Sequence, residues 1–137
     1  MINNKQIIDL ILNHFPDLLA VYIFGSQTSN ESLAKSDVDI AILLSIKEYM
    51  QTKPIYFYNV YFELESVLNI EVDLINLRQV NTVLQKEVIE TGNRIYCSDY
   101  IACDLFETHV YSSYQKLNEE RADIINDIIK SGRILAI

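Results

Sequence analysis

The sequence predicts a mixed α/β fold of the α+β class, in which a small mixed sheet carries helices packed on it. Helical and strand-like spacings of apolar residues follow one another in the order α-β-α-β-α-β-α-(β)-α. Half of the residues are hydrophobic and only three Gly and two Pro interrupt them, which disfavours disorder. The length of 137 residues suits a single domain over 1–137, with a core over about 1–97 and a C-terminal helical segment over about 98–133.

The amino-terminal third predicts one helix and two strands. The helix is expected over residues 4–15, where apolar residues recur at helical spacing, and Pro16 ends it because the residue before a proline avoids the helical region. A β-branched and aromatic run predicts the first strand over 19–24. A second apolar run predicts a strand over 38–44, in which Val38, Ile40, Ile42 and Leu44 share one face. The polar residues 25–36 between the two strands predict a turn, a short helix and a loop.

The middle of the chain predicts two helices around a third strand. A polar connection over 47–54 leads to a helix over 55–68, whose apolar and aromatic residues form one stripe. Its tyrosines could stack on a base, but their helical spacing favours packing in the core. The run IEVDLI at 70–75 alternates as a half-buried strand does and puts Glu71 and Asp73 on one acidic face. A helix is then expected over 81–91, closed by Gly92 as a left-handed cap.

The C-terminal part predicts a short edge strand and a long helix. The strand is expected over 94–97, and Asp99 is placed to cap the helix. The pattern suggests a break near Ser112-Ser113 and an end at Gly132. The candidate inward positions of this helix are Ile101, Leu105, Val110, Tyr114 and Leu117.

Composition excludes several classes of function. The net charge of −8 disfavours binding of DNA or RNA, and an acidic surface would suit a basic protein partner or simply aid solubility. No apolar run reaches the length of a membrane span and the N-terminus lacks a signal-peptide cleavage site, so we expect a cytoplasmic protein. Cys97 and Cys103, with two distant histidines, fit neither a disulfide framework nor a zinc site, and we interpret both as packing residues.

The stretch from 21 to 44 carries the candidate functional residues. Asp37 and Asp39 lie two apart at the start of a buried strand, so both carboxylates would face one side and need a partner. A divalent metal is the expected partner, because Mg²⁺ combines one or two carboxylates with substrate phosphates. Gly25 would let the backbone approach a phosphate, and Ser26 would add a hydroxyl and backbone N–H groups. These residues together predict a metal–nucleotide site.

The arrangement Gly25-Ser26, ten residues, then Asp37-Val38-Asp39 resembles the GS-x10-DxD signature of the DNA polymerase β-like nucleotidyltransferases. The resemblance covers roughly Val21 to Tyr96, and the short length is similar to that of the minimal nucleotidyltransferases, the MNT antitoxins paired with HEPN toxins. It implies a small nucleotidyltransferase-type mixed sheet, ATP as the substrate and two bound Mg²⁺ ions.

The resemblance also assigns roles to individual residues. Asp37 and Asp39 would bridge both metals, and Asp73 on the third predicted strand would complete the metal that activates the acceptor hydroxyl. Ser26 and the backbone after Gly25 would hold the β- and γ-phosphates.

One feature departs from the family pattern. Many minimal members resemble GSRARG at the turn, with a cation soon after the serine, whereas this chain has GSQTSN. Gln27 and Thr28 can donate hydrogen bonds but carry no charge. Lys35, or Arg78 just after the third strand, is the candidate replacement cation. An ordinary solvated charge is as good an interpretation for Arg78 and the better one for Lys35.

The function that the resemblance implies is that of an antitoxin. Such a protein adenylyltransferase would transfer AMP from ATP to a tyrosine hydroxyl of a HEPN ribonuclease toxin, release pyrophosphate and form a hetero-oligomer with the toxin. Two alternatives remain open: an antitoxin that neutralises the toxin by contact alone, and a nucleotidyltransferase of small molecules such as aminoglycosides. The chain lacks the further helical domain of the large antibiotic-modifying enzymes, which disfavours the second alternative.

Overall fold

The computed structural model describes residues 3–25 and 38–131 of the chain. Within these residues, no helix is long and apolar enough to cross a membrane. The elements in chain order are α1 (Asn4–His14), β1 (Ala20–Phe24), β2 (Val38–Leu43), α2 (Ile46–Gln51), α3 (Pro54–Leu68), β3 (Val72–Asn76), α4 (Thr82–Thr91), β4 (Asn93–Cys97) and α5 (Tyr100–Ser131).

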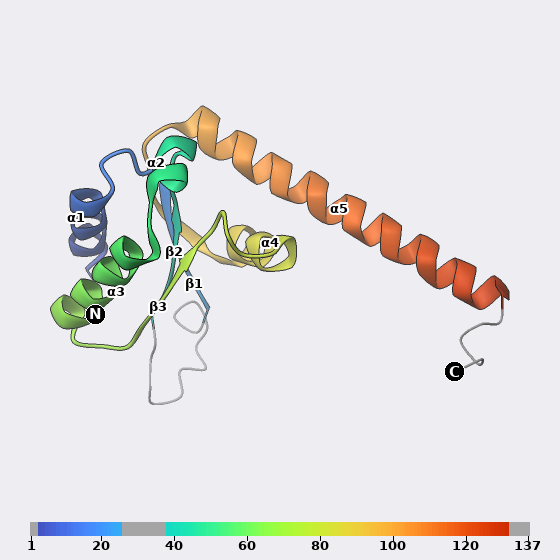
Figure 1. Cartoon of the computed structure of the whole chain (residues 1–137), viewed down its shortest axis with the longest axis horizontal. Helices are drawn as coiled ribbons and strands as arrows, with labels where there is room; N and C mark the ends of the chain where they lie inside the picture. Colours follow the sequence, from blue (N-terminus) through green and yellow to red (C-terminus); the bar gives the residue numbers. More distant parts are fainter. Residues whose placement is uncertain (1–2, 26–37, 132–137) are drawn as a thin grey trace.

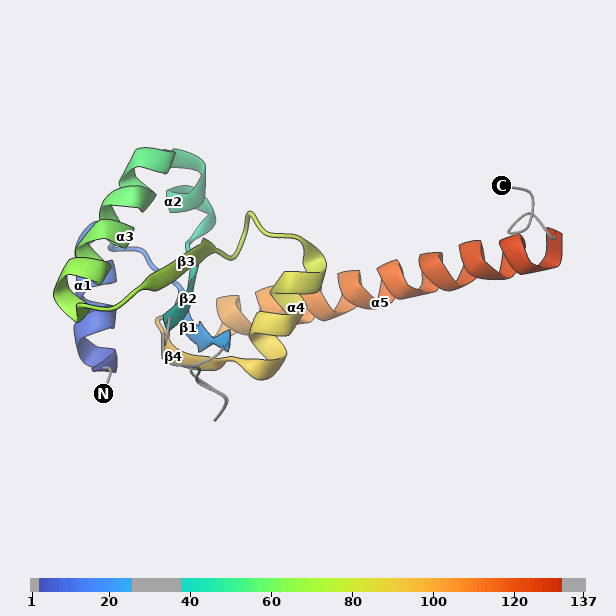
Figure 2. The same cartoon turned by 90° about the horizontal axis from the view of Figure 1, so that it is seen from below.

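The described strands form one mixed sheet in the order β3-β2-β1-β4, which confirms the predicted fold class and the short edge strand. The pair β2–β3 is parallel, and β1 pairs antiparallel with both β2 and β4. Helices cover both faces: α1 and α3 lie on one side, and α4 and the first turns of α5 lie on the other (Figures 1 and 2). From there α5 extends well beyond the sheet.

The central strand β2 divides the core into two clusters because its side chains alternate between the two faces. Val38, Ile40 and Ile42 are fully buried against α1 and α3, as the sequence predicts. Ala41 and Leu43 are buried on the face of α4 and α5. The same alternation therefore directs Asp39 to the face of α4 and α5.

The helices α1 and α3 confirm the periodic predictions. The Asn3 side chain accepts a hydrogen bond from the Lys5 amide at 3.0 Å and caps α1. Val60 and Leu64 of α3 are buried in the predicted stripe. His14 in the last turn of α1 lies at the surface, with Nε2 2.6 Å from Glu63 Oε2 of α3.

The polar connection predicted over 47–54 is wrong, because Ile46–Gln51 forms the short helix α2. The Ser45 side chain caps it by accepting a hydrogen bond from the Glu48 amide at 3.1 Å. Pro54 then occupies the first turn of α3, where a missing N–H costs nothing. Local capping therefore outweighs the polar composition on which the prediction rested.

Gly92 ends α4, but the predicted left-handed cap is wrong because its φ is −81°. A Cβ atom at this position would lie 2.4 Å from the carbonyl oxygen of Val88. Glycine is required here by the close approach of the backbone, not by its φ angle. The left-handed cap occurs instead at Asn69, which ends α3 with a φ of 55°.

The predicted cap of α5 is confirmed, but two of its predicted inward positions and its predicted break are wrong. Asp99 Oδ1 accepts a hydrogen bond from the Ala102 amide at 3.1 Å. Ile101 and Leu105 are 74% and 66% exposed, and the residues that pack inward include Cys103, Phe106 and Val110. The helix is continuous through Ser112-Ser113, since two serines lower helix propensity by only about 1 kcal/mol in total. The predicted end at Gly132 lies outside the described residues.

Candidate active site

Gly25, Asp39 and Asp73 lie on three neighbouring strands or at their ends. Asp39 of β2 pairs with Phe24 of β1 on one side, and with Asp73 of β3 on the other. Because residues in register share a face and neighbouring strands lie about 4.8 Å apart, the two aspartates stand side by side. The structure therefore brings together one carboxylate of the predicted pair and the later carboxylate of the third strand.

Gly25 packs directly on the Asp39 carboxylate. Its φ is +77°, which L side chains rarely adopt, and a Cβ atom there would lie 1.7 Å from Asp39 Oδ2. Both the backbone conformation and the space admit glycine alone. The backbone at the end of β1 is thus in contact with the Asp39 carboxylate.

The donor set suits a hard divalent cation. Asp73 is exposed, and none of the ion pairs among residues 3–25 and 38–131 involves it. Two adjacent carboxylates repel each other unless a cation neutralises them, and carboxylate oxygens are the ligands that Mg²⁺ prefers. No group of three potential ligands occurs among the described residues. Asp37, Ser26 and Gln27, which complete the predicted site, and Lys35 lie outside these residues.

Arg78 is placed away from the two aspartates. Its Nε donates a hydrogen bond to the carbonyl oxygen of Leu44 at 2.7 Å, and its guanidinium lies 5.3 Å from the centre of the Phe106 ring. Leu44 is five residues beyond Asp39, which corresponds to about 16 Å along the strand direction. Arg78 therefore ties the far end of β2 to α5, and the structure does not bring it to the carboxylates.

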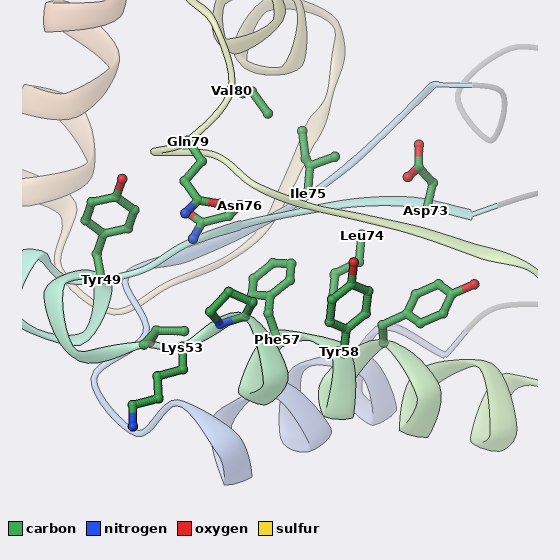
Figure 3. Close-up of a pocket in the computed structure, with 13 residues that line it drawn as sticks. Tyr49, Lys53, Phe57, Tyr58, Asp73, Leu74, Ile75, Asn76, Gln79 and Val80 are labelled. Carbon is green, nitrogen blue, oxygen red and sulfur yellow. The ribbon is translucent and has the colours of Figure 1, made fainter.

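A cavity of about 400 Å³ lies along the outer side of β3, which sequence reasoning missed (Figure 3). Its walls come from α2, α3, β3 and the residues after β3, and Asp73 is part of its lining. Tyr58 is 58% exposed and lines the cavity, whereas the sequence interpretation placed the tyrosines of this helix in the core. The position of Tyr58 outside the apolar stripe was the available signal.

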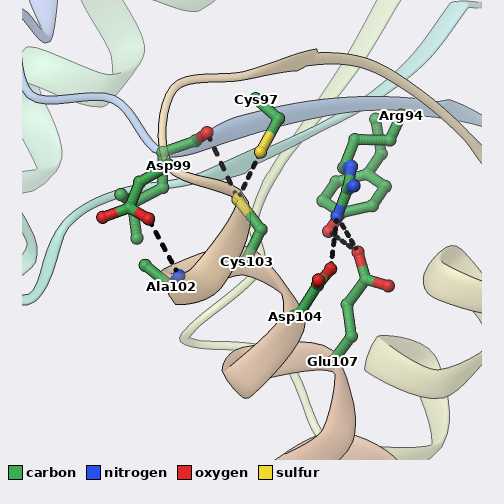
Figure 4. A network of polar contacts seen from close by, with 9 residues as sticks. Arg94, Cys97, Asp99, Ala102, Cys103, Asp104 and Glu107 are labelled. Atoms are coloured by element: carbon green, nitrogen blue, oxygen red, sulfur yellow. Dashed lines mark hydrogen bonds and ion pairs between the residues drawn. The ribbon is translucent and has the colours of Figure 1, made fainter.

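A second polar cluster lies between the sheet and α5 (Figure 4). Glu107 accepts hydrogen bonds from the Tyr22 hydroxyl at 2.6 Å and from Arg94 at 2.8 Å. Burial and the neighbouring Glu107 carboxylate raise the pKa of Tyr22, so its hydroxyl remains a donor. Cys97 and Cys103 are free thiols with their sulfurs 3.0 Å apart, and burial raises the pKa of Cys103 to about 12. Both cysteines pack between β4 and α5, as the sequence predicts.

Comparison with known proteins assigns most of the chain to one family. The family model described as "Polymerase beta, Nucleotidyltransferase" matches residues 5–101, which include all three strands of the candidate site. The chain belongs to the polymerase beta nucleotidyltransferase family. The match confirms the resemblance carried by the glycine–serine turn and the aspartates, and members of this family take a nucleotide as substrate.

One relative and several solved structures are similar over nearly the whole chain. The nucleotidyltransferase called protein adenylyltransferase MntA, from Shewanella oneidensis, is 32% identical over 128 residues, which cover 93% of this chain and 88% of the relative. A toxin–antitoxin structure with AMP-PNP has a TM-score of 0.78 at 32% identity, covering 93% of this chain and 99% of that one.

Two further structures extend the comparison. A complex of tri-AMPylated Shewanella oneidensis HEPN toxin with MNT antitoxin has a TM-score of 0.72 at 31% identity, and 92% of this chain and 95% of that one are covered. A minimal nucleotidyltransferase has a TM-score of 0.55 at 20% identity, covering 66% and 86% of the two chains. This last likeness supports the fold alone.

Proposed function

We propose that this protein transfers AMP from ATP to a tyrosine hydroxyl of a HEPN-type toxin and thereby acts as its antitoxin. The observation that carries the proposal is the contact between Gly25 and the Asp39 carboxylate, with Asp73 in register beside it. The 32% identity to a protein adenylyltransferase and the likeness to a complex with a tri-AMPylated HEPN toxin support the choice of reaction and partner. We place the reaction in the cytoplasm, in a hetero-oligomer with the toxin.

The chain's own residues divide between two tasks. Asp37, Asp39 and Asp73 would hold two Mg²⁺ ions, while Gly25, Ser26 and Gln27 would hold the phosphates with backbone and side-chain donors. Arg78 is not included, because its guanidinium is engaged between Leu44 and the Phe106 ring. When bound, Mg²⁺ neutralises phosphate charge and lowers the pKa of the acceptor hydroxyl.

The protein's contribution to the reaction is positioning and proton transfer. The acceptor oxygen forms a bond to the α-phosphorus of ATP, the bond from that phosphorus to the α–β bridging oxygen breaks, and pyrophosphate leaves with the electron pair. Asp73 is exposed at the sheet edge and accepts the hydroxyl proton. Gly25 and the donors after it keep the β- and γ-phosphates in place, so that the leaving group points away from Asp73.

Intact mass spectrometry tests this function directly. The protein, a cognate HEPN partner, ATP and Mg²⁺ are incubated, and both chains are weighed. We expect the partner to gain one or more AMP units, with pyrophosphate as the released product. A gain of phosphate with release of ADP would indicate phosphoryl transfer and would overturn the proposal.

A neutralising antitoxin without catalysis is the second candidate. It is favoured by the uncharged GSQTSN turn and by the placement of Arg78 away from the carboxylates. The same incubation distinguishes it, since this candidate predicts neutralisation of the toxin with no change in the mass of the partner.

A further inference from the structure

We propose that the cavity along the outer edge of β3 is the docking groove for the acceptor protein. Its occupant is a short extended segment of that protein, with the acceptor hydroxyl beside a basic residue. The proposal rests on the proposed function and adds the part of the site that sequence analysis did not find.

The order of the strands places the acceptor on this side. Gly25 follows β1, Asp39 lies on the middle strand β2, and Asp73 lies on the edge strand β3. In an in-line displacement the attacking and leaving oxygens lie on opposite sides of the phosphorus. If the turn at Gly25 holds the departing pyrophosphate, the hydroxyl arrives from beyond β3, where the cavity lies.

Among the described strands β3 is an edge strand, and its outer side offers backbone hydrogen bonds to an extended chain. Val38 donates to the Glu71 carbonyl at 3.0 Å and Leu77 donates to the Ile42 carbonyl at 2.9 Å, which fixes the parallel ladder to β2. In this ladder every second residue of β3 directs its backbone N–H and C=O toward β2. Leu74 lies between two such residues, so its N–H and C=O point outward, to the side of the cavity that it lines. An incoming segment can therefore pair with β3 as an added strand.

The available edge is short. The Val72 N–H already donates to Glu65 Oε2 of α3 at 3.0 Å, so α3 closes the groove at the start of β3. In Figure 3, Phe57 and Tyr58 lie on the α3 side of the strand, whereas the Asp73 carboxylate points to the opposite side. The segment would rest on the aromatic wall, and its hydroxyl side chain would cross the strand edge to reach Asp73.

Charge at the Asp73 end of the groove favours a basic neighbour of the hydroxyl, whereas Lys53 lies at the other end (Figure 3). A smaller cavity of about 250 Å³ shares Tyr61 and Asp73 with the groove, and its lining adds Glu65 and Glu71. The chain as a whole carries a net charge of −8. A cationic side chain next to the acceptor residue would therefore meet a complementary potential.

The outer wall continues onto exposed aromatic surface. Tyr58 and Phe62 are 58% and 62% exposed, and their ring centres lie 6.4 Å apart in a stacked arrangement. Tyrosine is enriched among residues that dominate binding energy at protein interfaces, and clustered exposed apolar side chains mark such interfaces. The groove thus has a rim suited to a protein and not only a pocket suited to a small molecule.

Steady-state kinetics with the HEPN partner as the acceptor test the groove. Tyr58→Ala removes one aromatic side chain from the wall of the groove. Gln79→Arg puts a positive charge at an exposed residue of its lining. Tyr56→Ala is the matched control, because Tyr56 is another exposed tyrosine of the same helix and does not line the groove. We expect each groove variant to raise KM for the acceptor about tenfold, with KM for ATP and the Tyr56→Ala variant unchanged.

Other outcomes overturn the proposal. A rise in KM for ATP with no change for the acceptor would assign the cavity to the nucleotide base, and unchanged values for both substrates would show that it is not used. If the wild-type protein transfers no AMP, the proposed function fails separately. The groove is then tested by calorimetry, which measures the affinity of each variant for the HEPN partner without nucleotide. Equal affinities of Tyr58→Ala and Tyr56→Ala would then overturn the groove.

Discussion

Carboxylates lie at two places on the same face of the sheet, and their surroundings differ. Near β4, Glu107 lies 2.8 Å from Arg94 and accepts the Tyr22 hydroxyl at 2.6 Å, so the protein supplies both a cation and a second donor. Near β3, Asp39 and Asp73 stand in register, and no ion pair of Asp73 occurs among the described residues. Glu107 thus finds its cation and its hydroxyl donor within the protein, whereas Asp73 has no ion pair among the described residues and suits a cation from solution.

The difference separates stability from function. A half-buried carboxylate with its own cation and hydroxyl donor holds α5 on the sheet, and removing it leaves polar partners unsatisfied. A pair of adjacent carboxylates at an exposed edge costs stability through repulsion and is useful only when something binds. Substitution of Glu107 should therefore change stability, whereas substitution of Asp39 or Asp73 should change activity.

The largest effect is expected on the rate of AMP transfer when Asp39 or Asp73 is changed. Asp39→Asn and Asp73→Asn keep side-chain size but remove the charge that holds the metals, so the rate of AMP transfer should fall at least about a thousandfold. The free energy of unfolding should stay equal or rise, since carboxylate repulsion is relieved. Radiolabelled AMP transfer and urea denaturation measure the two quantities, and Asp104→Asn, at a 70% exposed side chain, serves as the control. A stable variant that retains transfer would contradict the assignment.

A smaller effect, on stability and not on activity, is expected when Glu107 is changed. Glu107→Gln should lower the free energy of unfolding by about 1–3 kcal/mol, because Arg94 and Tyr22 lose a charged acceptor. Transfer by the folded protein should be retained. Glu90→Gln is the matched control, because Glu90 pairs with Lys86 across one turn of α4, and a solvated pair of this kind contributes little to stability. Equal losses in urea denaturation for the two variants would remove the distinction between the groups.

The fold was predictable where a residue pattern alone decides the structure. Period-two alternation placed Val38, Ile40 and Ile42 on one face of β2, and the structure agrees because side chains of a strand alternate. The predicted inward positions of α5 were wrong at Ile101 and Leu105, which are exposed, and Cys103 is buried instead. The inward face of α5 is set by the elements on which it packs, the sheet and α4, and the sequence of the helix alone does not contain their positions.

The site was predictable in its residues but not in its surroundings. The alternation of IEVDLI put Asp73 on an acidic face, yet only the parallel register shows that Asp73 is the neighbour of Asp39. The groove beside β3 requires α2 and α3 to be placed in space, and Tyr58 acquires its position from that packing. Sequence spacing describes single elements, whereas a cavity belongs to several elements at once.

Nucleotide binding with and without metal is the most direct test of the metal–nucleotide site. We expect Asp39 and Asp73 to admit a triphosphate only through a divalent cation, since adjacent carboxylates repel phosphate. Calorimetry should show ATP binding at least about tenfold tighter with Mg²⁺ than with a chelator, and Asp39→Asn should abolish this difference. Equal ATP affinity of the wild-type protein in Mg²⁺ and in chelator would contradict the account.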